Sequence, residues 1–209
     1  MRYSFPGIDK AIAELGYPRR VWFRGHVTVH QLLPTLFRFP GGPENEQRVF
    51  ARLRQEAHAV PGVLPAAGVS ALLATHYRYV PTRLLAWTEQ LAVALFCALV
   101  RESDQPAVFV LDPIALNAVS DVSGVITSTS DMWDAQRLSM WPLATSLPDF
   151  PIAIDLRSDH HDAREADTVY TMHGTNRAPL EQQCPQCVRR VVLTDEERSR
   201  SVAAILDGV

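Results

Sequence analysis

Two arginines in apolar surroundings are the residues of this sequence best suited to chemistry. Arg24 follows an apolar stretch and precedes Gly25, while Arg83 lies between Thr82 and two leucines. A guanidinium group presents a rigid set of donors that matches the oxygens of a phosphate or a carboxylate. Because an unpaired charge is costly in an apolar setting, each arginine needs either an anionic ligand or a structural partner. Three carboxylates are candidate structural partners: Glu46, Glu56 and Asp112.

The residues beside the two arginines prepare the backbone for such a role. Gly25 has no side chain, so a ligand or another backbone segment can approach Arg24 closely. Pro81 fixes its own backbone and disfavours a helical conformation of the residue before it. We therefore expect Arg24, Gly25, Thr82 and Arg83 to line an anion-binding site.

Histidines offer a second kind of chemistry. His76 and His173 are the candidates, because a histidine close to Glu181 could act as a general base. The alternative is a histidine at the edge of the core that is held by hydrogen bonds. Histidine alone does not discriminate between these two interpretations.

Cys184 and Cys187 form a single Cys-x-x-Cys motif. A structural zinc site needs four ligands, and the third cysteine, Cys97, lies in an apolar segment. His160, His161 or His173 could complete a site, but no spacing requires it. We predict no metal and expect two free thiols in a surface loop.

Composition and charge exclude several classes of protein. The net charge of −3 argues against an extended surface for nucleic acid, which needs clustered basic residues. The longest apolar run, Leu91–Val100, is half the length of a membrane-spanning helix, so we expect a buried helix and no membrane contact. The odd cysteine count and the absence of a signal-like start at Met1–Lys10 predict a cytoplasmic protein.

Hydrophobic patterns in the first half of the chain predict helices around short strands. Asp9 is suited to cap a first helix that ends at Gly16, and residues 21–23 have the composition of a strand. Residues 44–59 repeat apolar side chains at helical spacing, and Pro43 is typical of a helix start. A second apolar helix is expected at about 70–77, followed by extended chain over 80–85.

The second half contains the clearest strand of the sequence. Residues 107–111 form a continuous apolar run that ends at Asp112-Pro113, as in a central strand. Residues 188–193 predict another strand, and Thr194 with Glu197 form a capping box before a last helix. Residues 120–150 show no period and are expected to be an irregular region or a peripheral insertion. The interleaved pattern predicts one mixed α/β (α+β) domain over residues 1–209, with buried helices around a small central sheet.

The sequence resembles the FRG domain family, which takes its name from a Phe-Arg-Gly motif. The specific part of the resemblance is Pro81-Thr82-Arg83-Leu84-Leu85, followed by Trp87-Thr88. The order and spacing of further segments agree with the family over nearly the whole chain: residues 22–25, 33–38, 91–98, 108–113, 116–117, 170–174 and 179–181.

Four positions depart from the family pattern. The family usually has aspartate where this chain has Ala86, and an Ala-Gln-x-Gly segment where it has residues 165–168, including Ala166. Residues 76–79 replace Gln-His-x-Gly, and Leu91 replaces a proline. These losses put a family activity in doubt for this member.

The resemblance extends to a layout similar to that of ADP-ribosyltransferases. In such a layout the phosphates or ribose are bound by Arg24, Gly25, Thr82, Arg83 and Trp87. Thr88 braces the neighbouring strand. A carboxylate late in the chain stabilises the positive charge that develops on the ribose. Glu181 is the carboxylate expected by motif position, and Glu165 is the alternative. The resemblance leaves the cofactor open and makes NAD a candidate substrate.

Two functions therefore remain open. The first is a nucleotide-binding domain with this transferase-like layout, possessing NAD-dependent activity and belonging to a bacterial or phage-defence system. The second is a catalytically inactive module that recognises a nucleotide or a protein partner with the same pocket. The residues Ala86 and Ala166 favour the second.

Overall fold

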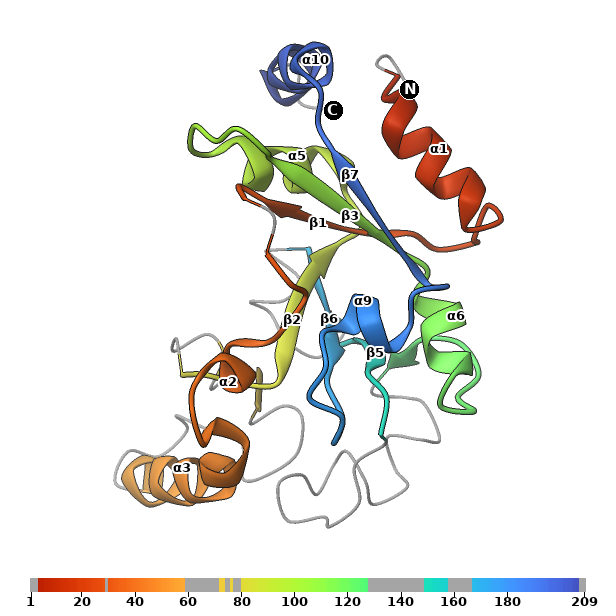
Figure 1. Cartoon of the computed structure of the whole chain (residues 1–209). Helices are drawn as coiled ribbons and strands as arrows, with labels where there is room; N and C mark the ends of the chain where they lie inside the picture. Colours follow the sequence, from red (N-terminus) through yellow and green to blue (C-terminus); the bar gives the residue numbers. More distant parts are fainter. Residues whose placement is uncertain are drawn as a thin grey trace.

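The computed structural model describes residues 4–28, 30–58, 72–73, 76, 80–127, 149–157 and 167–206. These residues form a mixed α/β fold with a seven-stranded sheet (Figure 1). The strands are β1 (Trp22–His26), β2 (Leu84–Thr88), β3 (Ala107–Leu111), β4 (Ile126–Thr127), β5 (Ile152–Asp155), β6 (Thr168–Met172) and β7 (Val188–Val192). The helices are α1 (Pro6–Glu14), α2 (Thr35–Arg38), α3 (Gly42–His58), α5 (Leu91–Leu99), α6 (Pro113–Ala118), α9 (Leu180–Gln183) and α10 (Asp195–Leu206).

The sheet consists of two half-sheets that meet at a narrow junction. Its strand order is β4-β5-β6-β2-β1-β3-β7, and only the β4–β5 pair is parallel. The β1–β2 junction has a single residue pair, Phe23 with Thr88, whereas β1 and β3 pair along five residues. In Figure 1 the half-sheet β1-β3-β7 occupies the upper part and the half-sheet β2-β6-β5 the lower part.

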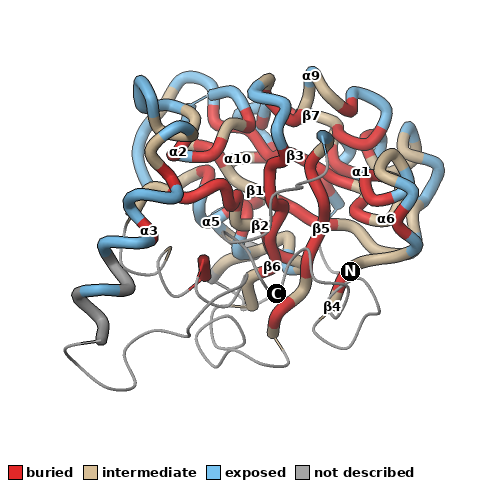
Figure 2. The backbone as a smooth tube through the Cα atoms, turned by 90° about the horizontal axis from the view of Figure 1, so that it is seen from below, coloured by how far each residue is buried: buried red, intermediate tan, exposed pale blue. Residues whose placement is uncertain are grey.

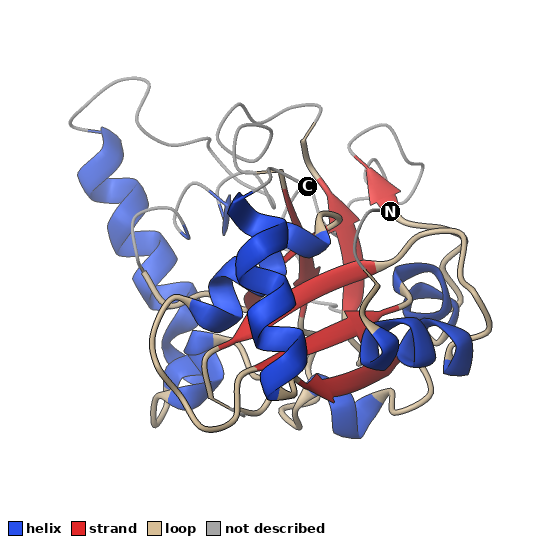
Figure 3. Cartoon of the chain, turned by 90° about the horizontal axis from the view of Figure 1, so that it is seen from above, coloured by secondary structure: helices blue, strands red, loops and turns tan. Residues whose placement is uncertain are grey.

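Burial follows the strands and the inner faces of the helices (Figure 2). Figure 3 shows the helices arranged around the strands of the sheet. One face of β1-β3-β7 packs on α1 and α5 through residues such as Phe23, Val108 and Leu95. The opposite face of this half-sheet packs on α6 and α9 through residues such as Trp22 and Leu111. The sheet is larger than the small central sheet expected, because β5 and β6 widen it on the β2 side.

Several local predictions are confirmed. The apolar run 107–111 is a fully buried strand, and Asp112 caps the following helix by accepting from the Ile114 and Ala115 amides. Glu197 accepts from the Thr194 amide, and Thr194 accepts from the Glu197 amide, as a capping box requires. Helix α3 and strand β7 also lie where they were predicted.

Other local predictions are wrong. Helix α1 begins at Pro6, so Asp9 lies in its first turn and is not its cap. Strand β1 continues through Arg24 to His26, which places the arginine inside the strand and not at its end. Helix α5 is not buried on all sides, because only Ala94, Leu95 and Ala98 are fully covered. A helix repeats every 3.6 residues, so an apolar run of nine residues covers all faces while the sheet covers only one.

The remaining predictions fall partly outside the described residues. Leu72, Leu73 and His76 are helical, as expected for the helix at about 70–77, but its other residues are not described. Residues 128–148 of the expected irregular region are also not described, while residues 126–127 form β4. Within the described residues, no helix is long and apolar enough to cross a membrane.

Candidate functional site

Arg83 is buried and its donors are directed at protein acceptors. Its Nε and Nη2 bind the two carboxylate oxygens of Glu46 in a two-pronged pair, with an Nε–Oε1 distance of 2.9 Å. Its Nη1 donates to the carbonyls of His173 (2.6 Å) and Gly174 (2.8 Å). The guanidinium also lies 5.6 Å from the centroid of the Phe37 ring. These contacts connect α2 and α3 to the segment after β6, so Arg83 ties three parts of the fold together.

The other residues predicted near Arg83 are equally enclosed. His173 is fully buried beside the Phe37 ring, and burial together with the Arg83 charge lowers its pKa to about 3. Thr82 is fully buried and its hydroxyl lies 2.9 Å from His76 Nδ1. None of the cavities described below includes Thr82, Arg83 or His173 among its lining residues.

Arg24 differs because no carboxylate of the described residues pairs with it. Its Nε donates to His26 Nε2 at 2.8 Å, and its Nη1 donates to the carbonyl of Ala86 at 2.5 Å. The second bond crosses from β1 to β2 just beyond the single residue pair that joins them. Burial and the nearby charge of Arg38 lower the pKa of Arg24 to about 10. Both causes disfavour the positive charge, and a bound anion would offset both.

A cavity of about 500 Å³, which we call the arginine cavity, opens beside Arg24. Arg38 from α2 and Arg101, which follows α5, also line it. Arg38 uses its Nε for the Leu33 carbonyl, and neither arginine has an ion pair with a described residue. The other lining residues are Gly25, His26, Val27, Thr28, His30, Cys97 and Val100, none of which is acidic. Three guanidinium groups thus surround one cavity without a described carboxylate to neutralise them.

His26 is a neutral partner within this positive environment. Burial and the charge of Arg24 lower its pKa to about 3, with smaller contributions from His30 and Arg38. Its Nε2 accepts from Arg24, so the ring proton is assigned to Nδ1. A neutral histidine can therefore orient the Arg24 guanidinium without repelling it at neutral pH.

Gly25 allows helix α5 to lie directly on β1. A Cβ at this position would lie 1.9 Å from the Ala94 carbonyl oxygen and 2.7 Å from the Ala98 amide nitrogen. The close approach that the glycine permits is thus made by a helix backbone. This packing brings the end of α5, and with it Arg101, to the arginine cavity.

Glu181 lines a second cavity of about 410 Å³. Both of its carboxylate oxygens accept from the Leu32 amide, at 3.2 and 3.0 Å, while the Leu180 amide donates back to the Leu32 carbonyl. These bonds fix the segment that carries His30, and His30 lines both cavities. The structure therefore brings Glu181 next to the arginine cavity and not into it.

Trp87 and Thr88 are core residues of β2. The Trp87 indole donates to the Thr171 hydroxyl at 3.0 Å, and its ring is buried. The Thr88 hydroxyl accepts from the Gln90 amide at 3.0 Å, which shapes the turn into α5. Beside this turn Arg20 and Arg157 bind Glu89 and Asp155, and both arginines lower the pKa of Asp155 to about 2.

The Cys-x-x-Cys motif is not part of a surface loop. Cys184 and Cys187 are free thiols and both are fully buried, so the expected location is wrong. The motif lies between α9 and β7, where the two sulfurs turn into the core while Pro185 and Gln186 remain exposed. Among the described residues, no group of three metal-ligating side chains occurs. His160, His161, Glu165 and Ala166 lie outside the described residues.

Sequence reasoning missed most of the arginine cavity. Arg38, Arg101, His26 and His30 come from four different places in the chain and none was singled out. His26 could have been found, because residues two apart on a strand point to the same face and Arg24 precedes it by two. The two more distant arginines carry no such local signal.

Comparison with known protein families finds a match over part of the chain. A family model described as FRG domain matches residues 19–106, which include β1, α2, α3, β2 and α5. Residues 19–106 thus match the FRG domain, and both arginine motifs lie within the matched segment. No curated protein and no solved structure matches the chain.

Proposed function

We propose that this FRG domain-containing protein binds a phosphate-bearing nucleotide in the arginine cavity. The observation that carries the proposal is the convergence of Arg24, Arg38 and Arg101 without a described carboxylate. Guanidinium groups form short, charge-assisted hydrogen bonds with phosphate oxygens. The cavity volume of about 500 Å³ falls in the range of small-molecule sites.

A binding module fits the surroundings better than an enzyme does. Thr88 and Trp87 face core partners, and Glu181 uses both oxygens to hold the Leu32 amide. Arg83 is engaged with Glu46, so we leave it outside the proposed binding site. Arg24 and Gly25 remain as the part of the predicted site that lines the arginine cavity.

Transfer of ADP-ribose from NAD is the second candidate function. The observation that favours it is the position of Glu181 in a cavity that shares His30 with the arginine cavity. In this reaction the bond between ribose and nicotinamide breaks, nicotinamide leaves, and a nucleophile that loses its proton bonds to the ribose carbon. A carboxylate near the ribose stabilises the positive charge that develops.

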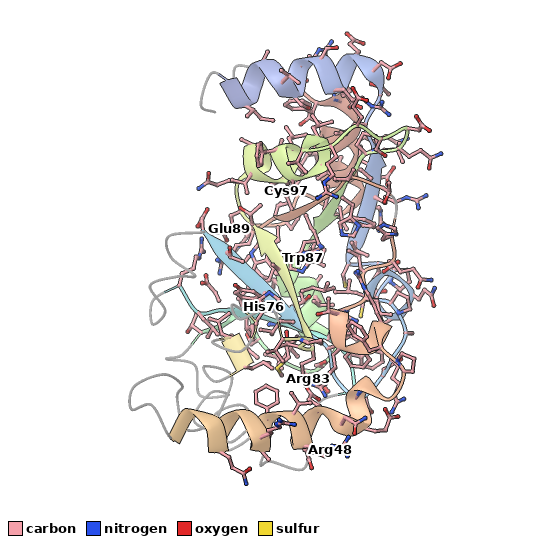
Figure 4. All side chains as sticks on the ribbon, turned by 90° about the vertical axis from the view of Figure 1, so that its left-hand side faces the viewer. Arg48, His76, Arg83, Trp87, Glu89 and Cys97 are labelled. Carbon is pink, nitrogen blue, oxygen red and sulfur yellow. The ribbon has the colours of Figure 1, made fainter. Side chains whose placement is uncertain are left out.

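Isothermal titration calorimetry with pyrophosphate, ADP and NAD tests binding. We expect Arg38→Ala and Arg101→Ala each to weaken pyrophosphate binding roughly tenfold, because each removes a charge-assisted contact. Arg48→Ala is the matched control, since Arg48 is exposed on α3 and lines neither cavity (Figure 4). If no probe binds, or if the control weakens binding equally, the proposed function is wrong.

Nicotinamide release from NAD separates the two functions. A binding module releases none above the uncatalysed level, even when NAD binds. Release by the unmodified chain that is lost in Glu181→Gln, with NAD affinity retained, would instead support the transferase.

A further inference from the structure

A row of three residues crosses the half-sheet β1-β3-β7 next to the arginine cavity. Arg24 lies opposite Phe109 on β3, and Phe109 lies opposite Arg190 on β7. Residues directly opposite one another on neighbouring strands project from the same face of a sheet. One face of this half-sheet therefore presents the sequence arginine, phenylalanine, arginine, over two strand spacings or about 10 Å.

The row joins the two cavities. Arg24 lines the arginine cavity, whereas Phe109 and Arg190 line the second cavity together with Glu181. His30 lines both, and the His26 ring lies 5.0 Å from the Phe109 ring in an edge-on arrangement. The two cavities are thus neighbours that share His30.

The second cavity has a different chemical character from the first. Its wall includes the aromatic ring of Phe109, and Arg190 is exposed without an ion pair among the described residues. Arginine stacks on planar rings through its guanidinium plane. Glu181 contributes a carboxylate, whose oxygens have acceptor capacity beyond the shared Leu32 amide. A planar ring that carries an amino group satisfies all three features.

We infer that the second cavity receives the amino-bearing base of the nucleotide whose phosphates occupy the arginine cavity. The inference rests on the proposed function and adds the ligand class, an adenine-like nucleotide. The phosphates bind Arg24, Arg38 and Arg101, the base lies between Phe109 and Arg190, and its amino group donates to Glu181. Arg189 does not contribute in the same way, because it is paired with Glu14.

Calorimetry with ADP, IDP and pyrophosphate tests the inference, since IDP has a carbonyl in place of the amino group. We expect Arg190→Ala to weaken ADP binding threefold to tenfold through the lost stacking, and to leave pyrophosphate binding unchanged. Arg190 is exposed and unpaired, so the variant is expected to fold. Arg48→Ala again provides the control, and IDP should bind more weakly than ADP to the unmodified chain.

The possible failures are distinguishable. If pyrophosphate binds but ADP and IDP bind equally well, or Arg190→Ala leaves ADP binding unchanged, the base does not occupy the second cavity and only this inference falls. An equal loss for pyrophosphate and ADP in Arg190→Ala would also overturn it, because Arg190 would then act on the phosphates. If pyrophosphate itself does not bind, the proposed function fails as well.

Discussion

Arg24 and Arg83 occupy similar places in the sequence and opposite situations in the structure. Arg24 lies inside β1 and Arg83 directly before β2, and each has a neutral, buried histidine close by whose pKa is lowered to about 3, His26 and His173 respectively. Arg83 is neutralised by Glu46 and enclosed by carbonyls. Arg24 has a histidine and one carbonyl as partners and faces a cavity with two more arginines.

The difference shows that two similar arginine motifs can have different internal partners, one a carboxylate and the other only neutral acceptors. A guanidinium bound by a carboxylate inside the protein has few donors left for a ligand, whereas one held by neutral acceptors keeps its charge available. The lowered pKa of Arg24, to about 10, expresses the same point, because no internal anion compensates its burial.

Breaking the Arg83–Glu46 pair should produce the largest loss of stability. Arg83→Met leaves Glu46 buried without its partner, so we expect the free energy of unfolding to fall by about 3–5 kcal/mol. Urea unfolding followed by circular dichroism measures it. The double variant Arg83→Met, Glu46→Leu should recover part of the loss. A loss below about 1 kcal/mol in the single variant would remove the structural role that we assign to Arg83.

Mild acid should destabilise both regions through their histidines. A histidine with a pKa near 3 in the folded protein and about 6.5 in the unfolded chain binds its proton more readily when unfolded. Its stabilising contribution is therefore complete above pH 6.5 and is lost as the pH falls toward 3. Between pH 7 and 5 each histidine should remove about 2 kcal/mol from the free energy of unfolding.

Histidine variants assign this acid sensitivity to the two regions. His26→Gln and His173→Gln should each reduce the loss between pH 7 and 5 by about 2 kcal/mol, measured by urea unfolding at both pH values. Saturating pyrophosphate should raise the pKa of His26, followed by NMR, because an anion beside Arg24 offsets the surrounding positive charge. An equal shift at His173 would contradict the separation of the two regions.

Gly25→Ala should disturb the arginine region through packing. The added Cβ would meet the Ala94 carbonyl at 1.9 Å, and a helix backbone cannot yield as a side chain can. We expect a loss of about 1–3 kcal/mol and weaker pyrophosphate binding, because α5 and Arg101 must shift. Unchanged stability within about 0.5 kcal/mol would show that α5 does not depend on this contact.

Arg24→Met should have the smallest effect on stability. The variant loses two hydrogen bonds but also removes a half-buried charge without a counter-ion, so these contributions partly offset each other. We expect a change within about 1 kcal/mol by urea unfolding, with loss of pyrophosphate binding by calorimetry. If Arg24→Met lowered the free energy of unfolding as much as Arg83→Met does, Arg24 would be a structural residue like Arg83, and the proposed difference between the two arginines would be wrong.

Local features of the fold were predictable because their signals lie within a few residues. The run 107–111 is apolar at every position, so both of its faces must be buried. Thr194 and Glu197 bind each other's backbone amides at the start of α10 without help from distant residues. The exposed face of α5 was not predictable, because its composition is apolar all round and packing against the sheet and α10 determines which sides are covered. Strands β5 and β6 were missed because Ile152–Asp155 is short and most partners of Thr168–Met172 come from β2, far earlier in the chain.

For the candidate site, the sequence predicted candidate residues but not which of them contact one another. The sequence singled out Arg24 and Arg83 equally, and named Glu46 as one of three carboxylates able to pair with them. Which arginine pairs with Glu46 depends on how α3 packs against the segment before β2, which is a tertiary property. The same holds for Arg38, Arg101 and Arg190, whose approach to Arg24 and Phe109 results from strand order and helix packing.

The single residue pair between β1 and β2 has a consequence for how the molecule opens. A sheet distributes its cooperativity along its ladders, and here the ladder narrows to Phe23 and Thr88, supplemented by the bond from Arg24 to the Ala86 carbonyl. We therefore expect the amides beside this junction to be less protected in hydrogen exchange than those inside either half-sheet. Arg24 makes the bond across this junction and is also the proposed anion ligand, so we expect an anion bound in the cavity to increase the protection of the junction from hydrogen exchange.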